Sequence, residues 1–174
     1  MIYRNSRGKY WLSGGTDLYA YDVNSEHAML KGSFNCIDIR AMADDGENLY
    51  FSAFGQGLCV MNIGTGAKQI YSMFDKPNRS TGVLCNNWIL KLLRDRHGMI
   101  WIGTASGVQC YDPRRKSFKP FGWDNILNGK PAIGLAEDPK GNIVIGTNNG
   151  LYLYNRATRK ATIFPHSENL PVAR

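Results

Sequence analysis

The sequence predicts an all-β fold assembled from repeated units of four antiparallel strands. The first observation is an internal repeat: DRHGMIWIGTASGVQCYD (95–112) and DPKGNIVIGTNNGLYLYN (138–155) are identical at eight of 18 positions. The second is that two weaker copies precede them, GKYWLSGGTDLYAYD (8–22) and GENLYFSAFGQGLCVMN (46–62). The third is that the apolar segments are short and rich in β-branched and aromatic residues, which strands prefer.

Four equivalent positions anchor the repeat: Trp11, Tyr50, Trp101 and Val144. They lie 39, 51 and 43 residues apart, and the longest interval contains a loop insertion at 75–85 with several turn-forming residues. We therefore interpret the whole chain as one segment of repeats. The segment is 1–174, and its approximate repeats are 1–34, 35–74, 86–121 and 130–164.

Each repeat is expected to contain four strands, which are clearest in the third copy. The first strand, 88–95, leads into a tight turn, because Asp95 can accept bonds from backbone N–H groups and a glycine three residues later tolerates a positive φ. A second strand at 99–104 and a third at 108–112 follow, and a poorer fourth strand begins at 118. The continuous apolar run MIWI indicates burial on both faces, so the small sheets must stack face to face.

Radial stacking meets this requirement and leaves only short, protected sheet edges. Four antiparallel strands in roughly 40–50 residues are typical of a β-propeller blade, whereas a leucine-rich repeat has a period of 20–29 residues. A β-solenoid has shorter rungs, and a two-sheet sandwich would not require the repetition. The sequence therefore predicts about four four-stranded antiparallel blades. Closure of four blades into a ring is possible, but only 1–7 stand where the first innermost strand is needed, so an open arc from a larger propeller is expected.

The third copy resembles the two-component regulator propeller repeat, D-x-x-G-x-x-W-I-G-T-x-x-G-(L/V)-x-x-Y-(D/N). The matching residues are Asp95, Gly98, Trp101, Ile102, Gly103, Thr104, Gly107, Val108, Tyr111 and Asp112, with Phe118 and Phe121 behind them. The fourth copy is similar but has Val144 where the family favours Trp, and the first two copies are degenerate at the I-G-T step. Nearly the whole chain takes part in this resemblance.

The resemblance implies the sensor region of a hybrid two-component system or a related sensor kinase. Such a region is periplasmic or otherwise extracytoplasmic, binds a ligand that is often a glycan fragment, and signals through a membrane helix to a cytoplasmic histidine kinase. Family members commonly form seven-bladed rings. The implied partners are therefore an oligosaccharide and either neighbouring blades or a second copy of the chain. Membrane contact would come only through segments outside this chain, because no apolar run here is long enough to span a bilayer.

Composition and motifs argue against catalysis, cofactors and nucleic acid. The net charge of +7 is scattered, and its densest run, PRRK at 113–116, is interpreted as a solvated turn. No nucleotide-binding glycine motif, RNA-reading motif or metal-ligand spacing occurs, and DDGEN at 44–48 lacks the spacing of a calcium loop. A carboxylate pair such as Asp95 and Asp138 remains open for glycoside cleavage, although both have a role in turns. We expect no catalytic residue, no cofactor and no metal site.

Recognition is expected on the long loops that connect one blade to the next. Because the strands alternate in direction, these loops share a face with the turns between second and third strands. Long loops on a rigid scaffold often carry binding residues. The expected ligand-binding residues are Trp123, Asp124, Asn125, Lys76 and Arg79. An aromatic ring among amides and charges suits a sugar, although packing of Trp123 under its own loop is an equal alternative. The predicted function is glycan sensing in a signalling receptor; the alternatives are a protein-interaction propeller and, less favoured, an enzyme.

Overall fold

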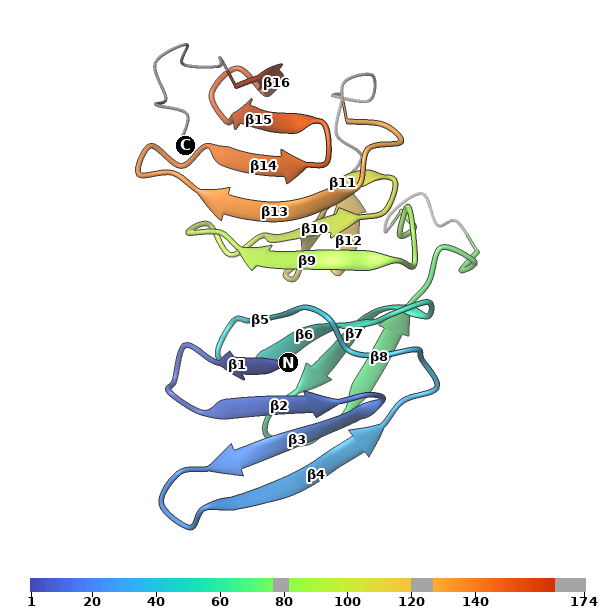
Figure 1. The fold of residues 1–174 in the computed structure, drawn as a ribbon, viewed down its shortest axis with the longest axis vertical. Helices are drawn as coiled ribbons and strands as arrows, with labels where there is room; N and C mark the ends of the chain where they lie inside the picture. Colours follow the sequence, from blue (N-terminus) through green and yellow to red (C-terminus); the bar gives the residue numbers. More distant parts are fainter. Residues whose placement is uncertain (77–81, 120–126, 165–174) are drawn as a thin grey trace, which may run out of the picture.

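The computed structural model describes residues 1–76, 82–119 and 127–164, which form 16 strands in four sheets (Figure 1). We call the sheets blades 1 to 4 in chain order. Blade 1 contains β1 (Ile2–Arg4), β2 (Tyr10–Gly14), β3 (Asp17–Asp22) and β4 (His27–Ser33). Blade 2 contains β5 (Met42–Asp44), β6 (Asn48–Ala53), β7 (Gly57–Asn62) and β8 (Lys68–Tyr71). Blade 3 contains β9 (Ile89–Arg94), β10 (Ile100–Thr104), β11 (Gly107–Asp112) and β12 (Ser117–Lys119). Blade 4 contains β13 (Ala132–Glu137), β14 (Ile143–Thr147), β15 (Gly150–Asn155) and β16 (Lys160–Ile163).

Every blade is an antiparallel meander in which consecutive strands pair. The strand register confirms that the four anchor residues are equivalent, because each lies on a second strand and faces the same position of the third strand. The pairs are Trp11–Ala20, Tyr50–Val60, Trp101–Cys110 and Val144–Leu153. The prediction of four four-stranded antiparallel blades is therefore confirmed, including the two degenerate copies.

Three apolar cores separate the four blades, one at each interface. Trp11 and Phe51 belong to the core between blades 1 and 2. Tyr50 and Tyr111 belong to the core between blades 2 and 3. Trp101 lies in the core between blades 3 and 4 and is only 1% exposed, as its sequence position predicted. Each inner blade thus buries side chains on both faces, which explains why its strands are apolar at consecutive positions.

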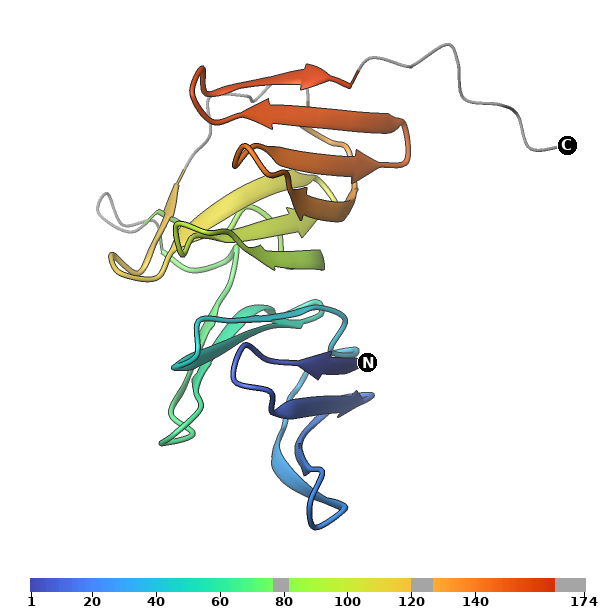
Figure 2. The same ribbon diagram turned by 90° about the vertical axis from the view of Figure 1, so that its left-hand side faces the viewer.

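The blades follow one another along an open arc. Blade 1 and blade 4 occupy opposite ends of the molecule in both views (Figures 1 and 2). The first strand of blade 3, β9, contacts the first strands of both neighbours, β5 and β13. First strands therefore lie on the inner side of the arc, as in a propeller. None of the described residues forms a helix that is long and apolar enough to cross a membrane.

The arc has two faces that carry different connections, and we call them the turn face and the loop face. The turn face carries the turns at 5–9, 45–47, 95–99 and 138–142, between first and second strands, and the turns between third and fourth strands. The loop face carries the turns between second and third strands and the connections between blades. Backbone hydrogen bonds join these last two groups: Ile37 donates to Phe54, Gly55 to Asn87 and Gly129 to Ser106.

No two cysteines are spaced as a C-x-x-C motif, so the sequence predicts small buried apolar residues, and the structure agrees for two of the four. Cys59 and Cys110 are buried, as expected for small apolar residues, but Cys36 is partly exposed and Cys85 is exposed. Cys85 lies in the connection that precedes β9, where its Sγ atom is 3.9 Å from Thr104 Oγ1. Cys85 is exposed because it lies in a connection at the surface and not in a strand. All four cysteines are free thiols.

Candidate functional site

The Asp-x-x-Gly turns on the turn face are built by hydrogen bonds to one carboxylate oxygen. Asp95 Oδ1 accepts from the backbone N–H groups of His97 and Met99, each at 2.9 Å. Asp138 holds its own turn in the same way through Asn142 N. In blade 1 the position is taken by Asn5, whose Oδ1 accepts from Arg7 and Lys9. The repeat pattern does not identify this asparagine, because its first position is an aspartate.

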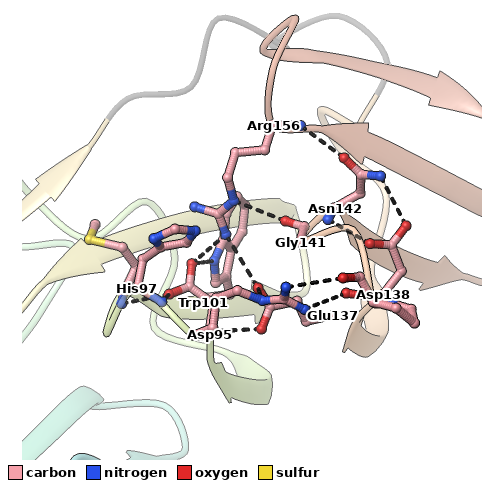
Figure 3. A network of polar contacts seen from close by, with 11 residues as sticks. Asp95, His97, Trp101, Glu137, Asp138, Gly141, Asn142 and Arg156 are labelled. Carbon is pink, nitrogen blue, oxygen red and sulfur yellow. Dashed lines mark hydrogen bonds and ion pairs between the residues drawn. The ribbon is translucent and has the colours of Figure 1, made fainter.

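The second oxygen of Asp95 joins blade 3 to blade 4 (Figure 3). Asp95 Oδ2 accepts from Trp101 Nε1 at 2.8 Å and from Arg156 Nη2 at 2.6 Å. Arg156 also donates from Nε to the carbonyl of Gly141. Burial alone would raise the pKa of Asp95, but the hydrogen bonds from Trp101, Arg156 and Met99 outweigh it and lower that pKa below its usual value.

A second clasp on the turn face connects the same two blades. Arg96 donates from its backbone N to Glu137 Oε2 and from Nε to Glu137 Oε1, both at 2.9 Å. Its Nη groups donate to the carbonyls of Asp138 and Pro139. Blades 1 and 2 have the matching contact, in which Ser6 donates from N and Oγ to Asp44. These polar contacts hold the turns of neighbouring blades in a fixed position relative to each other, because hydrogen bonds to charged groups are strong and directional.

This network has a structural role. Asp95 is 2% exposed and its oxygens are occupied by four donors, so a substrate cannot reach it. Asp138 binds both the N–H and the side-chain amide of Asn142. The pair therefore does not provide the free acid and base that glycoside cleavage needs. Among the described residues, no three His, Cys, Asp or Glu side chains gather as metal ligands.

Of the five predicted ligand-binding residues, the structure describes one. Lys76 is exposed in the first part of the connection between β8 and β9. The other four, Trp123, Asp124, Asn125 and Arg79, lie outside the described residues. The interblade hydrogen bonds nevertheless show that this connection belongs to the loop face, as the alternating strand direction predicted: Gly55 of a second–third turn donates to Asn87 of the connection.

The described part of the loop face presents a different tryptophan, Trp88, immediately before β9. Trp88 is 52% exposed, and its ring lies 5.3 Å from that of Phe54, centroid to centroid. Its backbone is held by Asn86 Oδ1, which accepts from Trp88 N at 2.7 Å, and by Ala105 N, which donates to its carbonyl. A half-exposed ring on a fixed backbone is suited to stacking against a ligand.

Charged groups lie beside this ring. The Arg40 guanidinium is 3.8 Å from the centroid of the Phe54 ring, and its Nε donates to both oxygens of Asp38 at 2.8 and 2.9 Å. The two Nη groups of Arg40 have no hydrogen-bond partner among the described residues. Exposed apolar side chains of Ile37 and Phe74 extend the same face. We call Asp38, Arg40, Phe54 and Trp88 the Trp88 site.

The Trp88 site combines an aromatic ring, a planar donor with free N–H groups and a carboxylate. Such a set can stack on the apolar face of a sugar and hydrogen-bond its hydroxyls. The predicted first strand, 88–95, included Trp88, and Trp88 was not among the predicted ligand-binding residues. A signal was available: Trp88 follows Asn86 and Asn87 at the end of a long connection, where side chains turn towards solvent.

Comparisons with known proteins agree with this architecture. The profile described as "Two component regulator propeller" matches residues 83–106, in the third blade. No curated protein matches the chain. Solved structures share its fold at 16–17% identity, and the chain spans only about a quarter of their length.

Three of these structures come from two bacteria. The extracellular domain of the hybrid two component system BT3049 from B. thetaiotaomicron has a TM-score of 0.75 and 16% identity, covering 95% of this chain and 24% of that chain. PorZ of Porphyromonas gingivalis, a surface component of the type-IX secretion system, has a TM-score of 0.73 and 17% identity, covering 98% and 27%. The extracellular domain of the one component system BT4673 from B. thetaiotaomicron has a TM-score of 0.59 and 17% identity, covering 98% and 28%. Residues 83–106 therefore match a two-component regulator propeller repeat, and the chain as a whole has the fold of a propeller segment.

Proposed function

We propose that this chain is a ligand-sensing propeller segment of an extracytoplasmic signalling receptor of the two-component type. The observation that carries the proposal is the two-component regulator propeller repeat at residues 83–106, set within four blades of that fold. Two of the similar solved structures are extracellular domains of signalling systems, which supports an extracytoplasmic location. A histidine kinase, where present, would lie outside this segment, and the segment itself has no catalytic role.

The ligand in this proposal is a glycan, and it binds on the loop face. The Trp88 site supplies the stacking ring and the free guanidinium donors. We propose that Lys76, together with the predicted residues Trp123, Asp124, Asn125 and Arg79, extends this contact. A rigid scaffold that presents an aromatic ring among polar groups is the usual make-up of a sugar-binding surface.

The test is a glycan-array screen followed by calorimetry of the best glycan with three proteins. Trp88→Ala should weaken binding by roughly 1–3 kcal/mol, as for other aromatic stacking platforms. His97→Ala, on the turn face, should bind like the wild type. Equal loss in both variants, or loss only in His97→Ala, would refute the assignment to the loop face. Identical affinity of Trp88→Ala and the wild type would refute the Trp88 site.

A protein-interaction propeller is the second candidate. The similarity to PorZ favours it, because that protein is a surface component of a secretion system. The exposed Ile37 and Phe74, at 61% and 81%, would suit a protein partner better than a sugar. This candidate would be favoured if the wild type bound a folded protein partner, Phe74→Ser did not, and neither protein bound a glycan.

The outer sheet faces of blades 1 and 4 are proposed to pack against another blade, either a neighbouring one or one from a second copy. In blade 4, Val144 and Leu153 pair across the sheet at the positions that Trp101 and Cys110 bury in blade 3. A pocket of about 510 Å³ lies over them, bordered by Phe164. Sedimentation velocity over a range of concentrations tests self-association. We propose no nucleic-acid partner.

A further inference from the structure

A cleft of about 410 Å³ opens between blades 2 and 3 on the turn face, opposite the Trp88 site. Its floor is formed by aromatic residues of both blades, and its rim by polar side chains of β6, β8 and the turn after β11. The residues that matter are Asn48, Tyr50, Gln69, Tyr71, Tyr111 and Lys116. The volume is within the range of small-molecule sites in proteins.

The cleft is open because of one difference between the repeats. Asp112 and Asn155 end the third strands of blades 3 and 4, so the residues that follow them, Pro113 and Arg156, are equivalent. Arg156 fills the space between blades 3 and 4 and reaches Asp95. Pro113 has no side chain long enough to fill the same space between blades 2 and 3, and it borders the cleft.

The floor of the cleft carries a hydroxyl donor that the protein does not use. The hydroxyls of Tyr111 and Tyr71 lie 3.1 Å apart and share one hydrogen bond. Whichever hydroxyl donates, the other retains a hydrogen for which the described residues provide no acceptor. Tyr71 is partly exposed and lines the cleft, so this donor is available to an oxygen atom of a ligand there.

The rim adds two cations, Lys116 and Lys68, one carboxylate, Glu47, and neutral amides. Lys116 is exposed and has no ion pair among the described residues. Gln69 is exposed and has an unused amide, which can both donate and accept. Asn48 donates to Asp45 Oδ2 at 3.3 Å, which leaves its carbonyl oxygen available as an acceptor. Asp45 accepts from Tyr50 and Asn48 and keeps its negative charge, so Lys116 and Lys68 have to offset the charges of Asp45 and Glu47 for an anion to bind.

We propose that this cleft binds a sugar acid, that is, a saccharide unit carrying a carboxylate, such as a hexuronate. The carboxylate accepts from the spare tyrosine hydroxyl and pairs with Lys116. The sugar hydroxyls donate to Asn48 and exchange hydrogen bonds with Gln69, while the ring lies against the edge of Tyr71. The cleft is independent of the Trp88 site, because the cleft lies on the turn face and the Trp88 site lies on the loop face.

The experiment is an NMR titration of the whole chain with glucuronate, with glucose and acetate as the neutral and the non-sugar probes. Tyr71→Phe removes a hydroxyl and keeps the ring, and it should weaken glucuronate binding by about tenfold, the loss of one charge-assisted hydrogen bond. Lys116→Gln should weaken it by several-fold. Lys160→Gln, which removes an exposed cation of blade 4, is the matched control and should not change it. Trp88→Ala should not change it either, which separates this site from the proposed glycan site.

Several results would overturn the inference. These are absence of glucuronate binding by the wild type, equal affinity for glucose or acetate, and unchanged affinity in Tyr71→Phe and Lys116→Gln. Loss of glucuronate binding in Trp88→Ala would assign the sugar acid to the loop face instead. Circular dichroism and a thermal midpoint check that the variants fold; if Tyr71→Phe does not, Lys116→Gln compared with Lys160→Gln decides.

Discussion

Replacing Asn5 with aspartate should stabilise the first blade. Trp11 is 1% exposed, and its Nε1 has no hydrogen-bond partner among the described residues. The equivalent atom of blade 3, Trp101 Nε1, donates to Asp95 Oδ2 at 2.8 Å. Asn5 makes the same backbone bonds through Oδ1 as Asp95, so its side-chain amide nitrogen, a donor, takes the place of that accepting oxygen.

The expected gain follows from opposing contributions. A buried donor without a partner costs about 1–3 kcal/mol, and an ionised acceptor in Asn5→Asp would remove that cost. Two effects oppose it: the new carboxylate is desolvated at a position only 5% exposed, and Ser6 brings Asp44 close through two hydrogen bonds. We expect a net increase of about 1 kcal/mol in the free energy of unfolding, or roughly 2–4 °C in the thermal midpoint for a chain of this size.

The assay is urea unfolding followed by tryptophan fluorescence, with the indole N–H signals of the folded state recorded by NMR. The reciprocal variant, Asp95→Asn, is the matched control. It removes the acceptor of Trp101 and Arg156 and should lower the free energy of unfolding by about 2–3 kcal/mol, less than for a fully buried pair because the Arg156 side chain is 29% exposed. An Asn5→Asp protein that is less stable than the wild type, or an Asp95→Asn protein that is equally stable, would refute this prediction. Either result would show that an accepting side-chain oxygen beside the indole N–H does not stabilise the blade.

Three further variants test other parts of the structure. Trp101→Ala should lower the free energy of unfolding by about 3–5 kcal/mol, because it empties the core between blades 3 and 4, and an unchanged urea midpoint would contradict that packing. Arg156→Met keeps an aliphatic side chain over Trp101 but leaves Asp95 without its charge partner. As the pH is lowered from 7, the free energy of unfolding of this variant should then fall less than that of the wild type. The sign follows from the depressed pKa of Asp95: its contribution is present above the unfolded pKa and is lost as the pH falls through the folded one. Trp88→Ala should change the thermal midpoint by little, since half of the ring is exposed, and a large drop would show that Trp88 supports the fold.

The sequence by itself determined the repeat, the strands and the order of the blades. Apolar residues at consecutive positions require burial on both faces of a strand, and the repetition of Trp11, Tyr50 and Trp101 at one place in the unit gives every blade the same register. Turn chemistry was readable for the same reason, because Asp95 and Asp138 hold their turns with atoms only a few residues away. Local contacts of this kind are written into short stretches of sequence.

The tertiary structure alone decided which residues the blades bring together. Arg156 lies 61 residues from Asp95, and nothing local in either turn indicates that they meet. Trp88 could be exposed only because the connection around Asn87 crosses the end of blade 2, and the cleft near Tyr71 exists because Pro113 stands where blade 4 has Arg156. These features depend on how one blade is placed against the next, and that placement results from the summed packing of side chains far apart in the chain.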